Sequence, residues 1–271
     1  MGHVFIQAKD IPTNEQAVWI DARYDLADSV YGRAQYDIEH IVGAIHWDLT
    51  KDLSDMTKEK SGRHPMPTKE QLHDLFEKAG ITYETPIYIY DGGGEPFATR
   101  AYWLLQYGGF TNARVIADGL EGLKQAGFET TTVEPNPVRS NLNIDWQDQI
   151  YVDRAYVKEV TEGKHDKVLI DARAHRRYIG EIEPLDPIAG HIPTARNFDW
   201  EQLKKGSTLF INDEIKKVAS KDENIIVYCG SGVSASPLYA VLKELGYEHV
   251  QLYTGSYSDW VMHYPIATGE E

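Results

Sequence analysis

Short apolar runs alternate with a helical pattern along the second half of the chain. Residues 167–173 ("KVLIDAR") and 224–229 ("NIIVYC") each read as a buried parallel strand, because their apolar runs are uninterrupted. At 236–246, apolar residues recur every three or four positions up to a glycine, which predicts an amphipathic helix with a glycine C-cap. Residues 249–253 ("HVQLY") supply a further strand. Strand, helix and strand in this order predict a parallel sheet joined by right-handed crossovers.

The same patterns occur twice along the chain, in the same order. The matching pairs are "WIDARYD" (19–25) with "LIDARAH" (169–175), "EHIVGAIHWD" (39–48) with "GHIPTARNFD" (190–199), "PIYIYDGGGEPFATRAYWLLQYGG" (86–109) with "NIIVYCGSGVSASPLYAVLKELGY" (224–247), and "VIADGLEGL" (115–123) with "QLYTGSYSDW" (251–260). The chain is therefore expected to be two copies of one α/β domain, each a parallel sheet with helices on both faces. We place these domains at 1–128 and 146–271, with a Pro- and Asn-containing linker at 129–145.

Composition narrows the class of protein. The 271 residues are 42% hydrophobic and 11% aromatic, which excludes wholesale disorder. A net charge of -15 argues against nucleic acid or an anionic membrane as a partner. The one cysteine excludes an internal disulfide framework and a multi-cysteine metal site, and we expect neither a metal nor a cofactor. The sequence shows no secretion signal or membrane span, so we expect a cytoplasmic protein.

That cysteine, Cys229, stands at the carboxyl end of a predicted strand. A lone cysteine is usually a small buried hydrophobic residue, but this one precedes a loop of small residues and then a helix. Ligands bind at such strand ends in open α/β sheets. The backbone N–H groups of the loop, with Gly230, Gly232, Val233 and Ser234 among its residues, are expected to point inward and to stabilise negative charge on the sulfur. We therefore interpret Cys229 as a nucleophile.

Two chemistries use a cysteine in a loop of this kind. A protein phosphatase needs an arginine six residues after the cysteine to bind the phosphate, and Ala235 stands at that position here. The loop is also short, and it suits one extra sulfur atom better than a phosphoryl group. Sulfur transfer through a cysteine persulfide, in two half-reactions, is consistent with the loop.

The duplicated halves together with "DAR", "GHIP" and "CGSGVSA" resemble the two-domain rhodanese-type sulfurtransferases over essentially the whole chain. The resemblance implies two rhodanese-like domains, of which the second is catalytic and the first is silent. The alignment of the two halves agrees, because Asp91 stands where the second half has Cys229.

The resemblance also implies roles for individual residues. Arg177 falls where the family has the arginine that binds the anionic end of the substrate. Ser231 matches a loop serine that helps to move protons, and His40 is a candidate for the histidine of its relay. Arg100 follows the Asp91 loop and is expected to line the cleft between the halves.

Two further conspicuous side chains are expected to be structural. Arg173 follows "DA" at a strand end and is expected to pair within its own domain, and His191 is expected to pack inside a loop.

The donor stays open between two candidates. The loop "CGSGVSA" resembles that of the 3-mercaptopyruvate sulfurtransferases, whereas "EPLDP" at 183–187 lacks their second arginine and favours thiosulfate. We favour 3-mercaptopyruvate, because the loop touches the reacting sulfur. The acceptor is expected to be a thiol, such as a thioredoxin, or cyanide. A non-catalytic rhodanese-like module that binds a partner or carries sulfur is the alternative of another class, and the retained cysteine argues against it.

Overall fold

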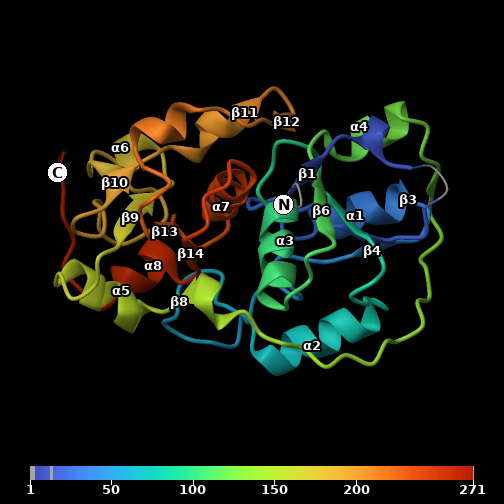
Figure 1. Ribbon diagram of the computed structural model, residues 1–271, viewed down its shortest axis with the longest axis horizontal. Helices are drawn as coiled ribbons and strands as arrows, with labels where there is room; N and C mark the ends of the chain where they lie inside the picture. Colours follow the sequence, from blue (N-terminus) through green and yellow to red (C-terminus); the bar gives the residue numbers. More distant parts are fainter. Residues whose placement is uncertain (1–3, 13–14, 271) are drawn as a thin grey trace. The chain divides into compact units, whose positions relative to one another are not determined.

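A computed structural model describes residues 4–12 and 15–270 of the chain (Figure 1). The chain divides into two compact units. The first comprises residues 1–55, 67–147 and 204–210, and the second comprises 56–66, 148–203 and 211–271. The units therefore do not coincide with the predicted halves. Residues 56–66 pack with the second unit, residues 204–210 pack with the first, and the expected linker at 129–145 is part of the first unit.

The first unit is built on a parallel sheet. Within the described residues its five strands run in the order β1 (Phe5–Ile6), β6 (Ala113–Ile116), β5 (Ile87–Tyr90), β2 (Val18–Asp21) and β4 (Ala44–His46). Its helices are α1 (Tyr31–Ile38), α2 (Lys69–Lys78), α3 (Phe97–Tyr107), α4 (Gly119–Gln125) and the 3-10 helix η1 (Ala8–Asp10). A short antiparallel pair, β3 (His40–Ile41) with β7 (Thr130–Thr131), completes it.

The second unit repeats this plan. Its sheet, again of five strands among the described residues, runs β8 (Tyr151–Val152), β14 (Val250–Tyr253), β13 (Ile225–Tyr228), β9 (Val168–Asp171) and β10 (Arg196–Asn197), and all neighbours are parallel. Its helices are α5 (Arg154–Thr161), α6 (His175–Tyr178), α7 (Ala235–Glu244), α8 (Ser256–Trp260) and the 3-10 helices η2 (Asp148–Ile150), η3 (Trp200–Leu203) and η4 (Glu214–Lys217). The short hairpin of β11 (Lys204–Lys205) and β12 (Thr208–Leu209) interrupts this part of the chain and belongs to the first unit.

Strand order is the same in the two sheets, with β1, β6, β5, β2 and β4 corresponding to β8, β14, β13, β9 and β10. Every side chain of the central strand β13 is fully buried. Because successive side chains of a strand point to opposite faces, this burial means that both faces of the sheet are covered. The predicted α/β fold with two copies of one domain is confirmed.

Helix α7 shows why the local sequence adopts this fold. It packs against β13 and β14, which lie beside it in Figure 1, and it buries most of its length. Pro237 is the third residue of α7, where the missing N–H costs no helical hydrogen bond. After the helix, Gly246 has a φ of +81°, and Tyr247 donates its N–H to the Leu242 carbonyl oxygen at 3.0 Å. These contacts form the predicted glycine C-cap.

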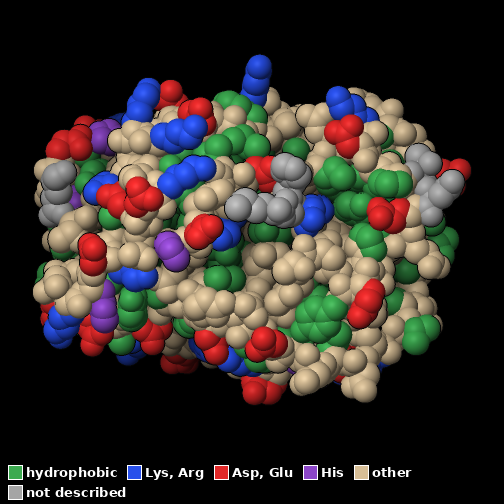
Figure 2. All heavy atoms as spheres, viewed as in Figure 1, with side chains coloured by type: hydrophobic (Ala, Val, Ile, Leu, Met, Phe, Trp, Pro, Cys, Tyr) green, Lys and Arg blue, Asp and Glu red, His purple; other side chains and the backbone are tan. Residues whose placement is uncertain are grey.

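Charge is mixed over the face of the second unit that Figure 2 presents, where basic and acidic side chains alternate without a large patch of one sign. In the part of the chain that the structure describes, no helix combines the length and the apolar character that a membrane crossing needs.

Candidate active site

Cys229 directly follows β13, at the carboxyl end of the strand. Its Sγ accepts a hydrogen bond from the backbone N–H of Gly232 at 3.1 Å. Gly232 has a φ of +75°, and a β-carbon there would collide with the carbonyl oxygen of Thr254, so the turn requires glycine. The cysteine is only 1% exposed. A reactant must therefore reach the sulfur through the mouth of this loop.

The first residues of α8 fasten the loop from behind. The Cys229 N–H donates to Ser256 Oγ at 3.1 Å, and the carbonyl oxygen of Cys229 accepts from the Tyr257 N–H at 3.0 Å. The Ser258 N–H donates to the carbonyl oxygen of Gly230 at 2.9 Å. Ser256 has a φ of +58°, a conformation that residues other than glycine rarely adopt. This conformation directs the Ser256 hydroxyl at the Cys229 N–H, and the resulting hydrogen bond holds the backbone of the cysteine in place.

Two guanidinium groups lie at the mouth of the loop, beside Gly230. A β-carbon built on Gly230 would lie 2.5 Å from Arg63 Nη2 and 3.5 and 3.7 Å from Arg177 Nη2 and Nη1. Arg63 comes from residues 56–66, the part of the early chain that packs with the second unit. A side chain at position 230 would displace the Arg63 guanidinium, whereas Arg177 lies at van der Waals distance, so the glycine lets Arg63 approach the residue next to Cys229.

Two buried acids hold the arginines. Arg177 donates to Glu183 Oε1 at 2.6 Å, and Arg63 forms an ion pair with Asp186. The Glu183 and Asp186 side chains are 2% and 3% exposed. Burial alone would raise the pKa of Glu183, but hydrogen bonds from Arg177 and from the Leu185 N–H outweigh it and hold this pKa below its usual range. The acid therefore stays ionised and fixes Arg177.

A histidine contacts the loop serine. His64 Nδ1 lies 2.8 Å from Ser231 Oγ, so the imidazole and the hydroxyl share a hydrogen bond two residues after the cysteine. Ser231 is 8% exposed. An imidazole next to a hydroxyl is an arrangement that can pass a proton toward a reacting group.

Comparison with known proteins places the chain in a family. The family model described as a rhodanese-like domain matches residues 6–126 and again residues 154–263. The chain belongs to the rhodanese family.

Relatives that match almost the whole chain are named after one or the other of the two candidate donors. The chain is 31% identical over 269 residues to the Mycobacterium tuberculosis protein named "Putative thiosulfate sulfurtransferase SseB", covering 96% of this chain and 94% of the relative. It is 33% identical over 263 residues to a "Probable 3-mercaptopyruvate sulfurtransferase" of Pseudomonas aeruginosa, covering 93% and 92%. The structure of a 3-mercaptopyruvate sulfurtransferase from Leishmania major is 27% identical, with a TM-score of 0.83 over 96% of this chain and 74% of that one. These names agree with the predicted enzyme class, and they do not distinguish the two donors.

The first rhodanese-like repeat has a carboxylate at the position of the thiol. Asp91 follows β5, and its two carboxylate oxygens accept the N–H groups of Gly93 at 2.8 Å and Ala98 at 3.0 Å. Burial, assisted by the charge of Glu95, raises the pKa of Asp91 to about 7. The loop thus has a carboxyl group in place of a thiol.

The contacts of His40 do not fit the relay role that we expected for it. His40 lies in β3 of the first unit, fully buried, with its ring stacked on Tyr36 at a centroid distance of 3.8 Å. Its Nδ1 and Nε2 lie 2.7 and 3.1 Å from the carbonyl oxygens of Tyr36 and Val133. Both ring nitrogens are thereby occupied by backbone of the first unit, and the histidine that contacts Ser231 is His64.

Arg173 and Arg100 are buried and make contacts within their own units. Arg173 is 2% exposed, binds Asp171 through its Nε and Nη2 nitrogens, and donates to the Gly190 carbonyl oxygen at 2.6 Å, which confirms its predicted pairing within the domain. Arg100 is fully buried in the first unit and donates to the Leu53 carbonyl oxygen at 3.1 Å. This interior position does not fit the cleft-lining role that we expected for it.

His191 packs inside its own unit, as expected. It stacks on Tyr178 at a centroid distance of 3.9 Å, and its Nδ1 lies 2.8 Å from the Tyr178 carbonyl oxygen. His40 and His191 occupy matching positions in the two repeats and make the same kind of contact. The repeat itself was therefore the signal that His40 is structural.

Sequence reasoning missed Arg63 and His64. They lie in "SGRHPMP" at 61–67, which has no clear helical or strand periodicity. The available signal was that this polar stretch has no counterpart among the paired segments of the two halves, so its residues were free to differ in function. Nothing in the local pattern indicates that the stretch packs beside residues more than 160 positions later.

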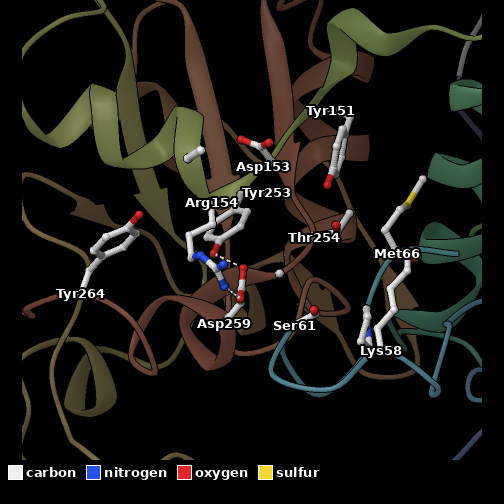
Figure 3. A pocket seen from close by; sticks show the side chains of 13 residues that line it. Lys58, Ser61, Met66, Tyr151, Asp153, Arg154, Tyr253, Thr254, Asp259 and Tyr264 are labelled. Atoms are coloured by element: carbon white, nitrogen blue, oxygen red, sulfur yellow. Dashed lines mark hydrogen bonds and ion pairs between the residues drawn. The ribbon is translucent and has the colours of Figure 1, made fainter. Parts of the chain in front are cut away.

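A cavity of about 290 Å³ lies in the same unit (Figure 3). The described residues that line it include neither Cys229 nor Arg177. Its central polar groups already bind one another: Arg154 pairs with Asp259, and the Tyr253 hydroxyl donates to Asp259 at 2.6 Å. These contacts stabilise α8, whose first residues fasten the cysteine loop.

Proposed function

We propose that the protein is a sulfurtransferase that carries sulfur as a persulfide on Cys229, with 3-mercaptopyruvate as the favoured donor. The observation that supports this most directly is the hydrogen bond from the Gly232 N–H to Cys229 Sγ at 3.1 Å, at the carboxyl end of β13. A backbone N–H directed at the sulfur stabilises negative charge on it. The same contact can hold a thiolate before the reaction and after the sulfur has been passed on.

The first half-reaction balances without any cofactor. The Cys229 thiolate attacks the sulfur of 3-mercaptopyruvate, a sulfur–sulfur bond forms, and the carbon–sulfur bond breaks. The electron pair of that bond leaves on the enolate of pyruvate. The donor thiol loses one proton and the enolate takes up one proton, so the step neither consumes nor releases protons overall. In the second half-reaction a thiol or cyanide attacks the outer sulfur and releases the Cys229 thiolate.

His64 and Ser231 supply the proton path for this donor. The Ser231 hydroxyl gives a proton to the departing enolate, and the imidazole of His64, 2.8 Å away, restores it. Thiosulfate leaves as sulfite, a stable anion at neutral pH, and needs no such proton. The His64–Ser231 contact is therefore the specific reason to favour 3-mercaptopyruvate over thiosulfate.

Arg177 binds the anionic end of the donor. Glu183 fixes its Nε and Nη2 atoms, so that the guanidinium faces Gly230. A fixed fork of N–H donors suits a carboxylate and also the sulfonate end of thiosulfate, so this residue supports either donor.

Steady-state turnover at equal concentrations of the two donors, with a thiol or cyanide as acceptor, tests the donor. Faster turnover with 3-mercaptopyruvate is expected, and faster turnover with thiosulfate would reverse the choice. Mass spectrometry of the protein after incubation with donor alone tests the mechanism, with one extra sulfur atom expected on Cys229. A loaded protein that never turns over with any acceptor would instead indicate a sulfur carrier.

A further inference from the structure

The cavity in the second unit has its floor at the carboxyl end of β14 (Figure 3). Residues 253–255 form this floor, and ligands bind at such strand ends in open α/β sheets. One wall comes from residues 151–155, where β8 leads into α5, and the other comes from the segment at 56–66. Neither Cys229 nor Arg177 is among the described residues that line the cavity, so its occupant need not be the sulfur donor.

Thr254 brings an unpartnered hydroxyl to the floor of the cavity. The residue is only 2% exposed, and its hydroxyl makes no hydrogen bond within the part of the chain that the structure describes. Its backbone is packed tightly, because a β-carbon on Gly232 would lie 2.3 Å from its carbonyl oxygen. A buried hydroxyl without a partner is costly, so this one favours an occupant that donates or accepts a hydrogen bond.

Arg154 and Lys58 supply positive charge to the cavity. Arg154 pairs with Asp259 through Nη1, while its Nε and Nη2 make no hydrogen bond to any described residue. Its side chain is 32% exposed, so a small molecule can reach it. Arg154 is also the first residue of α5, where the N–H groups of the opening turn lack helical partners and the helix dipole favours negative charge. A carboxylate is the group that suits this wall.

Asp153 supplies negative charge with a free acceptor atom. It caps α5, with Oδ1 accepting the Tyr156 N–H at 2.8 Å, and its Oδ2 has no partner among the described residues. In Figure 3, Asp153 and Lys58 come from opposite walls, on either side of Thr254. A purely anionic ligand would meet Asp153, and a purely cationic one would meet Lys58 and Arg154. A molecule that carries both charges is therefore complementary to this lining.

Apolar surface completes the cavity. Pro65 and Met66 contribute it from one wall, and the rings of Tyr151 and Tyr264 contribute it from elsewhere in the unit. The volume of about 290 Å³ lies near the lower limit of small-molecule sites, which suits a ligand of amino-acid size.

We propose that this cavity binds an α-amino acid with an apolar side chain. Its carboxylate contacts Arg154 at the start of α5, its ammonium group contacts Asp153, and the Thr254 hydroxyl takes one further hydrogen bond. The proposal does not depend on the sulfur chemistry, so the failure of either leaves the other standing.

Calorimetric titration of the full-length protein tests the proposal. The probes are L-leucine and L-methionine, with isocaproate as the leucine analogue that lacks the ammonium group and isoamylamine as the one that lacks the carboxylate. At least one of the two amino acids is expected to bind, and both analogues are expected to bind ~10-fold more weakly than leucine or worse, because each loses a charge-assisted contact. Absence of binding by both amino acids at millimolar concentration, or an analogue that binds as well as leucine, would overturn the proposal.

Substitutions in the lining test the assigned contacts. Asp153→Asn keeps an N-cap residue and removes the charge, and it should weaken amino-acid binding by ~10-fold. Thr254→Val removes the hydroxyl at nearly constant shape and should weaken binding by ~5–10-fold. Thr161→Val is the matched control, because its hydroxyl donates to the Lys158 carbonyl oxygen outside the cavity, and it should leave binding unchanged. Unchanged affinity in Asp153→Asn, an exposed position that does not threaten folding, would refute the assignment.

Competition and hydrogen exchange locate the bound amino acid. Thiosulfate should not displace it, and the backbone N–H groups of residues 151–156 and 253–255 should exchange more slowly in its presence. Displacement by thiosulfate, or protection confined to the loop that follows Cys229, would place the amino acid in the sulfur site and overturn the proposal.

Discussion

The two repeats place different groups at the centre of the same strand–loop–helix frame. In the first, β5 leads through the Asp91 loop into α3, and two backbone N–H groups bind the Asp91 carboxylate. In the second, β13 leads through the Cys229 loop into α7, and the Gly232 N–H binds the sulfur. In one loop the backbone N–H groups bind a carboxyl group of the loop itself, whereas in the other the same kind of donor is directed at the sulfur of Cys229.

The two loops also differ in the chain segment that packs against each of them. The hairpin at 204–210 lies against the first loop, where a β-carbon on Gly94 would be 3.2 Å from the Thr208 nitrogen. The segment at 56–66 lies against the second loop and contributes Arg63 and His64. The shared strand, loop and helix therefore fix the position of the residue after the strand. The chemical properties of the loop depend on whether that residue is Asp91 or Cys229 and on the segment that packs against the loop.

The largest effect is expected from replacing the sulfur of Cys229 with oxygen. Cys229→Ser should lower sulfur transfer by at least ~10³-fold, because no other thiol can act as the nucleophile. Asp91→Asn is the matched change in the loop of the first repeat, and it should leave most of the activity. Turnover with both donors measures this pair, and substantial activity in a clean Cys229→Ser preparation would refute the persulfide mechanism.

The proton path should give the next largest effect. Ser231→Ala and His64→Ala should each lower turnover with 3-mercaptopyruvate by ~10²-fold or more, the usual size of general acid–base assistance. Because the two residues act as one unit, the double variant should be little worse than either single variant. Thiosulfate turnover serves as the internal control and should fall much less. Equal losses with both donors would mean that Ser231 only shapes the loop.

Arg177 tests the proposed anion site of the second repeat. Arg177→Ala should lower kcat/KM. The expected loss of transition-state stabilisation is roughly 2–4 kcal/mol, the scale of a lost buried charge contact. Arg177→Lys should restore only part, because a lysine cannot form a bidentate fork. Measurement of kcat/KM for each donor checks the prediction, and an unchanged value in Arg177→Ala would exclude the residue from donor binding.

Asp91 should affect stability and leave activity nearly unchanged. Its pKa of about 7 in the folded protein lies above the value of about 3.9 expected when unfolded, so the folded state holds the extra proton between these values. Stability from this group is therefore present at low pH and is lost as the pH rises through 7. Between pH 5 and pH 8 the free energy of unfolding should fall by about 3 kcal/mol more than in Asp91→Asn. Urea unfolding of both proteins at the two pH values measures the difference, and parallel pH dependence would show that burial does not perturb Asp91.

Repetition made much of the fold predictable. The strands at 168–171 and 225–228, helix α7 with its glycine C-cap, and the place of Cys229 at a strand end all follow from local patterns of apolar residues. Arg173 was predictable for the same reason, because Arg23 makes the equivalent contacts with Asp21 in the first repeat.

The candidate site was predictable only in part. Cys229, Ser231 and Arg177 lie on segments that the repeat and the resemblance identify, and the structure places all three at the loop of the second unit. His40 was chosen from the same alignment, but a residue that recurs in both repeats keeps the structural role that both share. Its ring packs on Tyr36 as that of His191 packs on Tyr178.

The sequence by itself determined the two α/β repeats, the strand end that carries the thiol and the absence of a thiol from the first loop. These depend on short-range periodicity and on which residue occupies one position. Only the tertiary structure decided that Arg63 and His64 join Cys229, and that Asp186 links Arg63 with Arg177. Those contacts depend on the path of an irregular segment at 56–66, which is fixed by long-range hydrogen bonds such as that from the Arg63 N–H to Ser258, and no local pattern of residues encodes such a path.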